Sequence, residues 1–203
     1  RHQECMQAAR LLGVTHLAEI TSEQLGLAED SLPKVAARRA RHVVGETERV
    51  QAVIRALGRG DLAQVGGLLT ASHRSSQFQF ENSTAELDFL VTTLIAVPHV
   101  YGARLSGGGF GGAVLAMTDS AISPGDASGV SAAYLRQFGK EPEVLALRRA
   151  WAGREALRHL LALEELQRGR LPKQTFDRLL IGHERRALRP DVKVPALIFA
   201  GPM

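Results

Sequence analysis

Glycine is concentrated in one short stretch of this chain, because six of its 20 glycines lie between residues 102 and 112. A run of this density costs backbone entropy on folding, so it usually marks a place where the main chain must approach another group closely. Successive N–H groups without neighbouring Cβ atoms also converge readily on an anion, typically a phosphate. A flexible hairpin loop is the alternative interpretation of the same residues.

Strand-like sequence flanks the glycines on both sides, at residues 100–105 and 113–117. We therefore expect a loop between two antiparallel strands that faces an open cleft. Gly107, Gly109 and Gly112 satisfy the pattern G-x-G-x-x-G, but a strand follows them where dinucleotide binding needs a helix. The sequence also lacks the G-K-[ST] of a P-loop. Neither of these two nucleotide-binding folds is predicted.

Helical periodicity dominates the rest of the first 140 residues. The apolar spacing predicts helices over residues 4–12, 34–57, 61–72, 83–97 and 126–138. Together with the late pair of strands, this order is typical of an α+β fold rather than of a strict βαβ alternation. The polar stretch 77–84 is expected to be irregular.

Charged residues on the helix expected at 34–57 are interpreted as one solvated face. We expect i,i+3 and i,i+4 ion pairs among Arg38, Arg39, Arg41, Glu46, Glu48 and Arg49. Ser72 and His73 are also polar, but adjacent side chains on a helix point about 100° apart and form no nucleophile–base pair unaided. A helix end, a cleft or a solvated loop are the alternative locations for these two residues.

Cys5 is the only cysteine, which excludes an intramolecular disulfide and a multi-cysteine zinc site. Its place on an apolar helix face indicates a buried small hydrophobe, and a single cysteine fits a reducing cytosol. His183-Glu184 begins an H-E-x-x-H pattern, but residue 187 is Ala. No metal site is therefore predicted.

The formal net charge of +4 lies entirely in the last 63 residues. Residues 1–140 carry 13 basic and 13 acidic side chains, whereas residues 141–203 carry 12 basic and 8 acidic ones. The first 140 residues show no basic stripe with interleaved aromatic residues, so a nucleic-acid partner is not predicted. No apolar run approaches the roughly 18 residues that would span a membrane.

Several blocks of the sequence, in register over about 140 residues, resemble galactokinases of the GHMP kinase superfamily. The most specific block is YGARLSGGGFGG at 101–112, which is similar to the third GHMP signature motif, with Ser106 in place of the usual Thr. The other blocks begin at Glu4-Cys5, Arg38-Arg39, Gly60-Asp61-Leu62, Ser72-His73 and Phe80-Glu81-Asn82.

The resemblance implies a GHMP kinase C-terminal domain over residues 1–140, helix-rich, with a small antiparallel sheet that carries the glycine-rich loop. It implies a cytoplasmic enzyme that transfers the γ-phosphoryl group of ATP to the anomeric hydroxyl of galactose with the help of Mg²⁺. The residues carried over to the substrate and nucleotide cleft are Ser106, Gly107, Gly108, Gly109, Phe110, Gly111 and Gly112.

The resemblance covers only the C-terminal part of that family. Galactokinases carry their sugar-recognition signature, phosphate-binding loop and catalytic aspartate in the N-terminal part, so no catalytic residue is assigned within this chain. We expect the chain to begin inside a longer protein and to be inactive alone. A truncated non-catalytic fragment and a sugar- and ATP-binding sensor of the same superfamily are the open alternatives.

Residues 141–203 are expected to be a separate Arg-rich tail of unknown origin. Ten of its 12 basic residues are Arg, as a shifted reading frame in GC-rich DNA tends to give. An amphipathic helix is predicted by Leu147, Trp151, Leu157, Leu160, Leu161 and Leu163, and residues 192–200 predict a strand. The alternative is a genuine helical extension that buries Trp151 and Leu157 against residues 1–140.

Overall fold

The computed structural model describes residues 1–119, 122–148 and 195–200 of the chain. The helices are α1 (His2–Leu11), α2 (Ser22–Ala28), α3 (Lys34–Gly58), α4 (Leu62–Ser75), α5 (Ala85–Ile95) and α6 (Pro124–Phe138). The strands are β1 (Val100–Ser106), β2 (Ala113–Thr118), β3 (Glu143–Arg148) and β4 (Pro195–Ala200). Short helical turns are η1 (Leu17–Glu19), η2 (Glu29–Ser31) and η3 (Ser76–Phe80), the last of them a π-helix.

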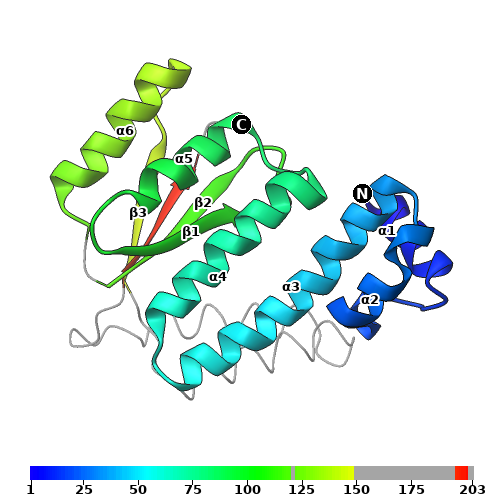
Figure 1. The fold of residues 1–203 in the computed structure, drawn as a ribbon. Helices are drawn as coiled ribbons and strands as arrows, with labels where there is room; N and C mark the ends of the chain where they lie inside the picture. Colours follow the sequence, from blue (N-terminus) through cyan, green and yellow to red (C-terminus); the bar gives the residue numbers. More distant parts are fainter. Residues whose placement is uncertain (120–121, 149–194, 201–203) are drawn as a thin grey trace, which may run out of the picture.

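Helix α3, with 25 residues, connects the two ends of the helical part. Its N-terminal half packs against α1 and α2, and its C-terminal half runs beside α4 (Figure 1). The first core lies at the N-terminal end, where small side chains let the helices approach closely. Its buried members are Ala8, Ala9, Leu17, Leu25, Leu32, Ala36, Ala37, Ala40 and Val44. Cys5 is half-buried against this core.

A second core joins α5 and α6 to the sheet. Apolar residues of α5 and α6 meet alternate residues of β1 and β2, as the period of two along a strand requires. The buried members are Leu87, Leu90, Val91, Leu94, Ala103, Leu105, Val114, Ala116, Val130 and Tyr134. The α+β fold with an antiparallel strand pair around the glycines is therefore confirmed.

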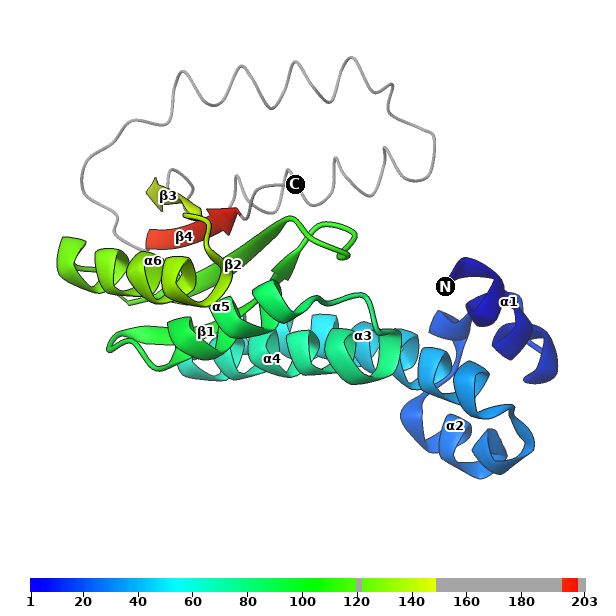
Figure 2. The same ribbon diagram turned by 90° about the horizontal axis from the view of Figure 1, so that it is seen from above.

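The sheet has the strand order β1-β2-β4-β3, and each neighbouring pair is antiparallel. Figure 2 shows α4 beyond β1, at the opposite end of the sheet from β3. Leu147, the first residue of the expected amphipathic helix, lies in β3 instead, because residues 143–148 form a backbone ladder with β4. The other residues of that expected helix lie outside the described residues. The strand expected at 192–200 is present as Pro195–Ala200.

Two other expectations need correction or stay open. Residues 76–80 are helical rather than irregular, because η3 continues α4 without a break. The division into residues 1–140 and 141–203 stays a prediction, although β3 and β4 share the sheet with β1 and β2. Trp151 and Leu157 lie outside the described residues. Of the helices that the structure describes, none is long and apolar enough to cross a membrane.

Helix α4 meets β1 backbone to backbone. A Cβ atom on Gly66 would overlap the Tyr101 carbonyl group, and a Cβ atom on Gly102 would overlap the Gly66 carbonyl group. Two hydrogen bonds reinforce this junction: the amide of Ala103 donates to Thr70 Oγ1 and the amide of Leu105 donates to His73 Nδ1, each at 3.3 Å. The helix thus fixes the strand from which the glycine loop departs.

Candidate functional site

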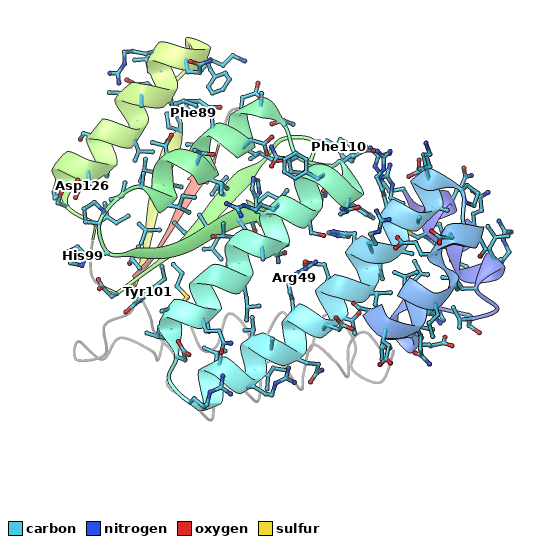
Figure 3. The ribbon with its side chains drawn as sticks, viewed as in Figure 1. Arg49, Phe89, His99, Tyr101, Phe110 and Asp126 are labelled. Carbon is cyan, nitrogen blue, oxygen red and sulfur yellow. The ribbon has the colours of Figure 1, made fainter. Side chains whose placement is uncertain are left out.

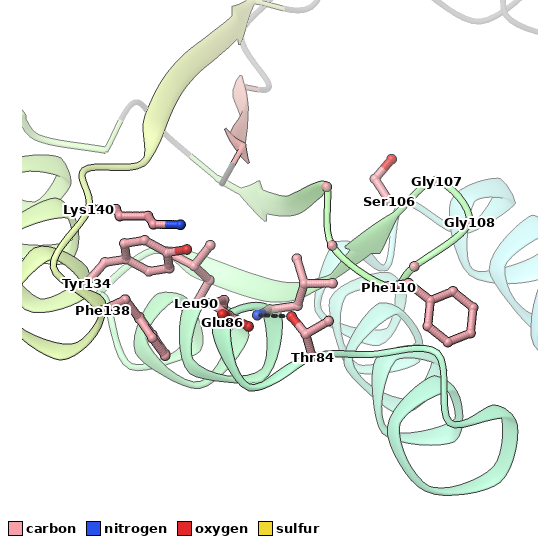
Figure 4. A pocket seen from close by; sticks show the side chains of 14 residues that line it. Thr84, Glu86, Leu90, Ser106, Gly107, Gly108, Phe110, Tyr134, Phe138 and Lys140 are labelled. Atoms are coloured by element: carbon pink, nitrogen blue, oxygen red, sulfur yellow. Dashed lines mark hydrogen bonds between the residues drawn. The ribbon is translucent and has the colours of Figure 1, made fainter. Parts of the chain in front are cut away.

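The loop between β1 and β2 forms one wall of a cavity of about 620 Å³. The opposite wall comes from the start of α5, the end of α6 and Lys140, two residues beyond that helix (Figure 4). The lining residues are Ser106, Gly107, Gly108, Gly109, Phe110, Gly111 and Gly112 with Thr84, Glu86, Leu87, Leu90, Tyr134, Phe138 and Lys140. The loop therefore faces a cleft, as the sequence predicts, and all seven expected site residues lie together.

The loop backbone explains why glycine occupies it. Gly107, Gly109, Gly111 and Gly112 have φ between +80° and +124°, a region that residues with a Cβ atom rarely adopt. Phe110 shares the left-handed region at φ +60°, and its ring is 66% exposed. Figure 3 shows this ring pointing from the loop toward the N-terminal helices, where the Arg1 guanidinium lies 5.9 Å from its centre.

Asn82, between η3 and α5, makes two hydrogen bonds to the loop. The amide of Phe110 donates to the Asn82 carbonyl oxygen at 2.6 Å, and Asn82 Nδ2 donates to the carbonyl oxygen of Gly108 at 3.0 Å. A Cβ atom on Gly109 would overlap the same Asn82 carbonyl. Close contact with Asn82 and positive φ both therefore require glycine at position 109.

A buried arginine anchors the segment that carries Asn82. Arg39 on α3 is 1% exposed and donates to Glu4 at 2.6 Å, to Glu81 at 2.7 Å and to the carbonyl oxygen of Gln79. Burial opposes its charge, but the bonds to both carboxylates raise the pKa of Arg39. The same bonds lower the pKa of Glu4 and Glu81. All three groups are thus ionised at neutral pH.

Of the charged residues on α3, Arg39 is buried, which contradicts the expected solvated face, whereas Arg41 and Glu48 are exposed as expected. Arg39, Arg38 and Arg41 pair with residues of other elements, and Glu48 accepts from Ser22. Only Arg49 and Glu46, 2.6 Å apart, form the predicted i,i+3 pair. Tertiary packing brings acids from α1, η2 and the η3–α5 segment next to the helix, and helical spacing alone does not reveal them.

Ser72 and His73 are both 3% exposed, so the solvated-loop alternative is wrong. They point to different partners, as the 100° separation predicts: Ser72 donates to Glu46 at 2.7 Å, whereas His73 Nε2 lies 3.1 Å from Asp88. Asp88 also accepts from Ser83 at 2.5 Å. Burial lowers the pKa of His73 despite the nearby carboxylate, so the ring is neutral and its Nδ1 accepts from β1.

Charges at the far end of the cavity are of both signs. The amide of Glu86 and the Thr84 hydroxyl lower the pKa of the Glu86 carboxyl, and Lys140 lowers it further. Burial raises the pKa of Tyr134, which stays a neutral hydroxyl. Among the described residues, no group of three His, Cys, Asp or Glu side chains is placed to hold a metal ion. No residue of the described part is therefore assigned as a metal ligand.

Sequence reasoning missed the residues that complete this site. Asn82 and Arg39 belong to blocks quoted for the resemblance, but nothing in their spacing links them to a loop more than 25 residues away. Tyr134 and Phe138 fall within the helix expected at 126–138, and Lys140 lies beyond its expected end. The helical period of α6, which puts residues 134 and 138 on one face toward the loop strands, is the signal that was available.

Comparisons with known proteins agree with this geometry. Residues 53–140 match the family described as GHMP kinases C terminal. The chain is 40% identical to human galactokinase over 154 residues, which is 72% of this chain and 39% of that protein. It is 42% identical to a galactokinase of Thermotoga neapolitana over 118 residues, 58% of this chain and 33% of that protein.

Among solved structures, the fold is similar to Lactococcus lactis galactokinase complexed with galactose, with a TM-score of 0.66 and 29% sequence identity. That likeness covers 68% of this chain and 37% of the other. The chain thus spans 32–39% of the length of these and two further mammalian galactokinases that it matches.

Proposed function

We propose that this chain, whose residues 53–140 match the GHMP kinase C-terminal family, is the C-terminal portion of a galactokinase and completes an active site that phosphorylates galactose. The phosphoryl donor is ATP and the acceptor is the anomeric hydroxyl of the sugar. The observation that carries this proposal is the glycine loop, Ser106 to Gly112, which forms one wall of the 620 Å³ cavity.

Phosphoryl transfer depends mainly on positioning and on stabilisation of the charge that spreads over the transferring oxygens. Within the described part of the chain, Phe110 is the only residue from 107 to 112 whose amide donates a hydrogen bond. The amides of the five glycines are therefore available to an anion, and no Cβ atom of theirs holds a phosphate away. The Ser106 hydroxyl is a further donor beside them.

The chain shapes the cleft and supplies no base. Galactokinases place their catalytic aspartate and sugar-recognition residues in the part that this chain does not cover, so we propose that the 203 residues alone are inactive. The proposed use of ATP supports a cytoplasmic location.

Complementation tests the proposal. The chain is co-expressed with the N-terminal part of human galactokinase, and ATP-dependent formation of galactose phosphate is measured. We expect no turnover from the chain alone, turnover from the pair, and loss of that turnover in the Gly107→Val, Gly109→Val double variant. Gly129→Ala is the matched control, because a Cβ atom there meets nothing within 4 Å.

Two results would contradict the proposal. Turnover by the isolated chain, above that of the double variant, would show that it holds its own base. An active pair that carries both valines would show that the loop is not part of the active site. Binding of galactose and ATP by the pair without any turnover would instead favour the sensor alternative.

A further inference from the structure

Asn82 makes both of the contacts that fix the middle of the glycine loop. Its carbonyl oxygen accepts from the Phe110 amide at 2.6 Å, and its side-chain Nδ2 donates to the Gly108 carbonyl oxygen at 3.0 Å. The two bonds bracket Gly109, so they hold one turn of the loop from both sides. The Asn82 side chain is 6% exposed, and its Oδ1 has no hydrogen-bond partner among the described residues.

Asn82 is itself held in place by a rigid segment. Its amide donates to the carbonyl oxygen of Ser76 at 3.2 Å, and Ser76 is buried. The preceding residue, Glu81, has φ +55° and is paired with Arg38 at 3.0 Å and with buried Arg39 at 2.7 Å. A non-glycine residue stays in this conformation only when its surroundings hold it there. The position of Asn82 is therefore set by α3 and not by the loop.

The two bonds also decide which loop amides stay free. They use the Phe110 amide and the Gly108 carbonyl oxygen, and both point toward Asn82. With these two groups committed, the loop cannot turn over to bury its glycine amides against η3. A hydrogen-bond donor at position 82 thus keeps the free amides of the loop on the side of the cavity.

We propose that Asn82 is a positioning residue for phosphoryl transfer, which fixes the Gly108–Phe110 turn so that the glycine amides face the transferring phosphate. The inference rests on the proposed function for the use of the loop, and on geometry alone for its shape. If Asn82 had a purely structural role, its substitution would destabilise the whole domain. If Asn82 positions the loop, its substitution changes the loop and leaves the core unchanged.

The first experiment measures amide hydrogen exchange in the full 203-residue chain by NMR. Asn82→Asp keeps the size of the side chain but replaces the donor with a carboxylate oxygen that faces the Gly108 carbonyl. We expect exchange of the Phe110 amide, the hydrogen-bonded amide of this loop, to rise at least about tenfold, and exchange of core amides such as Leu90 and Val114 to stay within about twofold.

Ser83→Ala is the matched control, because Ser83 is the neighbouring residue and donates to Asp88 rather than to the loop. We expect its loop amides to exchange as in the unaltered chain. Unchanged loop exchange in Asn82→Asp, or an equal rise in loop and core amides, would overturn the inference. Asn82→Ala should behave as Asn82→Asp, which excludes an effect of the new charge.

The second experiment measures kinetics in the complemented pair. We expect Asn82→Asp to lower kcat about tenfold or more with little change in KM for galactose, because the loop acts on the phosphoryl group and not on sugar binding. A looser loop with unchanged kcat would overturn the role in phosphoryl transfer. If the unaltered pair is inactive, the proposed function is contradicted but the role of Asn82 in the loop is not. The exchange experiment tests that role without any turnover.

Discussion

Glycine serves opposite purposes in two neighbouring regions of this molecule. At the junction of α4 and β1, Gly66 and Gly102 have no room for a Cβ atom, because the two backbones touch. In the loop that follows β1, Gly107 and Gly111 have nothing within 4 Å of where a Cβ atom would lie, and need glycine for its positive φ. The first region uses glycine to make a contact, and the second uses it to leave a surface open.

The comparison separates stability from function. A side chain at the junction would push apart two elements of the core, whereas a side chain at most loop positions would alter only the loop and the cavity beside it. Variants in the two regions should therefore fail in different ways: junction variants unfold, and loop variants fold but lose their site.

The largest effect is expected at the junction itself. Gly66→Ala places a Cβ atom on the Tyr101 carbonyl group, which no rotamer change relieves, so it should cost about 3 kcal/mol or more. Gly67→Ala is one residue away on the same helix, meets nothing within 4 Å and should gain about 0.5–1 kcal/mol from helix propensity. Thermal unfolding measures both, and equal Tm values for the two variants would break the comparison.

Position 109 combines both uses of glycine and should give an intermediate effect. Gly109→Ala strains a backbone at φ +80°, and its Cβ atom overlaps the Asn82 carbonyl group. We therefore expect the free energy of unfolding to fall by about 1–3 kcal/mol, with the structural change limited to the loop. Gly108→Ala is the control for stability, because Gly108 lacks a positive φ and a close neighbour. Denaturant unfolding compares the two, and a larger loss of stability at 108 than at 109 would contradict this account.

Acid should weaken the junction. Burial lowers the pKa of His73, so below its ordinary value of 6.5 the unfolded chain binds a proton that the folded chain does not. Stability should therefore fall as the pH decreases from about 7, with a slope of at most about 1.4 kcal/mol per pH unit for this residue. Burial also lowers the pKa of His42, which adds to the fall in the same direction.

His73→Asn tests this assignment, because the Asn oxygen can replace Nδ1 as the acceptor for the Leu105 amide without titrating. We expect a flatter dependence of unfolding free energy on pH between about 5 and 7. His16→Asn is the control, since its ring is 73% exposed. An unchanged slope in His73→Asn would show that the junction does not titrate.

Local sequence was sufficient for the loop and insufficient for its support. Glycine spacing and two strand-like flanks predicted the hairpin and the cleft that it faces, because backbone conformation is a local property. The seven residues of its wall were assigned through the resemblance of 101–112 to the third GHMP signature motif. Arg39 was expected in solvent and is 1% exposed, since its acceptors Glu4 and Glu81 come from 35 and 42 residues away. Asn82 depends in the same way on a contact that forms only in the folded chain.

The hydrogen bonds from Ala103 and Leu105 to side chains of α4 also determine how the sheet ends. β1 is an outer strand, and the amides that face away from β2 already have acceptors in Thr70 and His73. An unpaired outer strand is a template onto which another chain can add, and that is a common route to aggregation. Here the covering helix closes the β1 end of the sheet to strand addition by another copy of the chain.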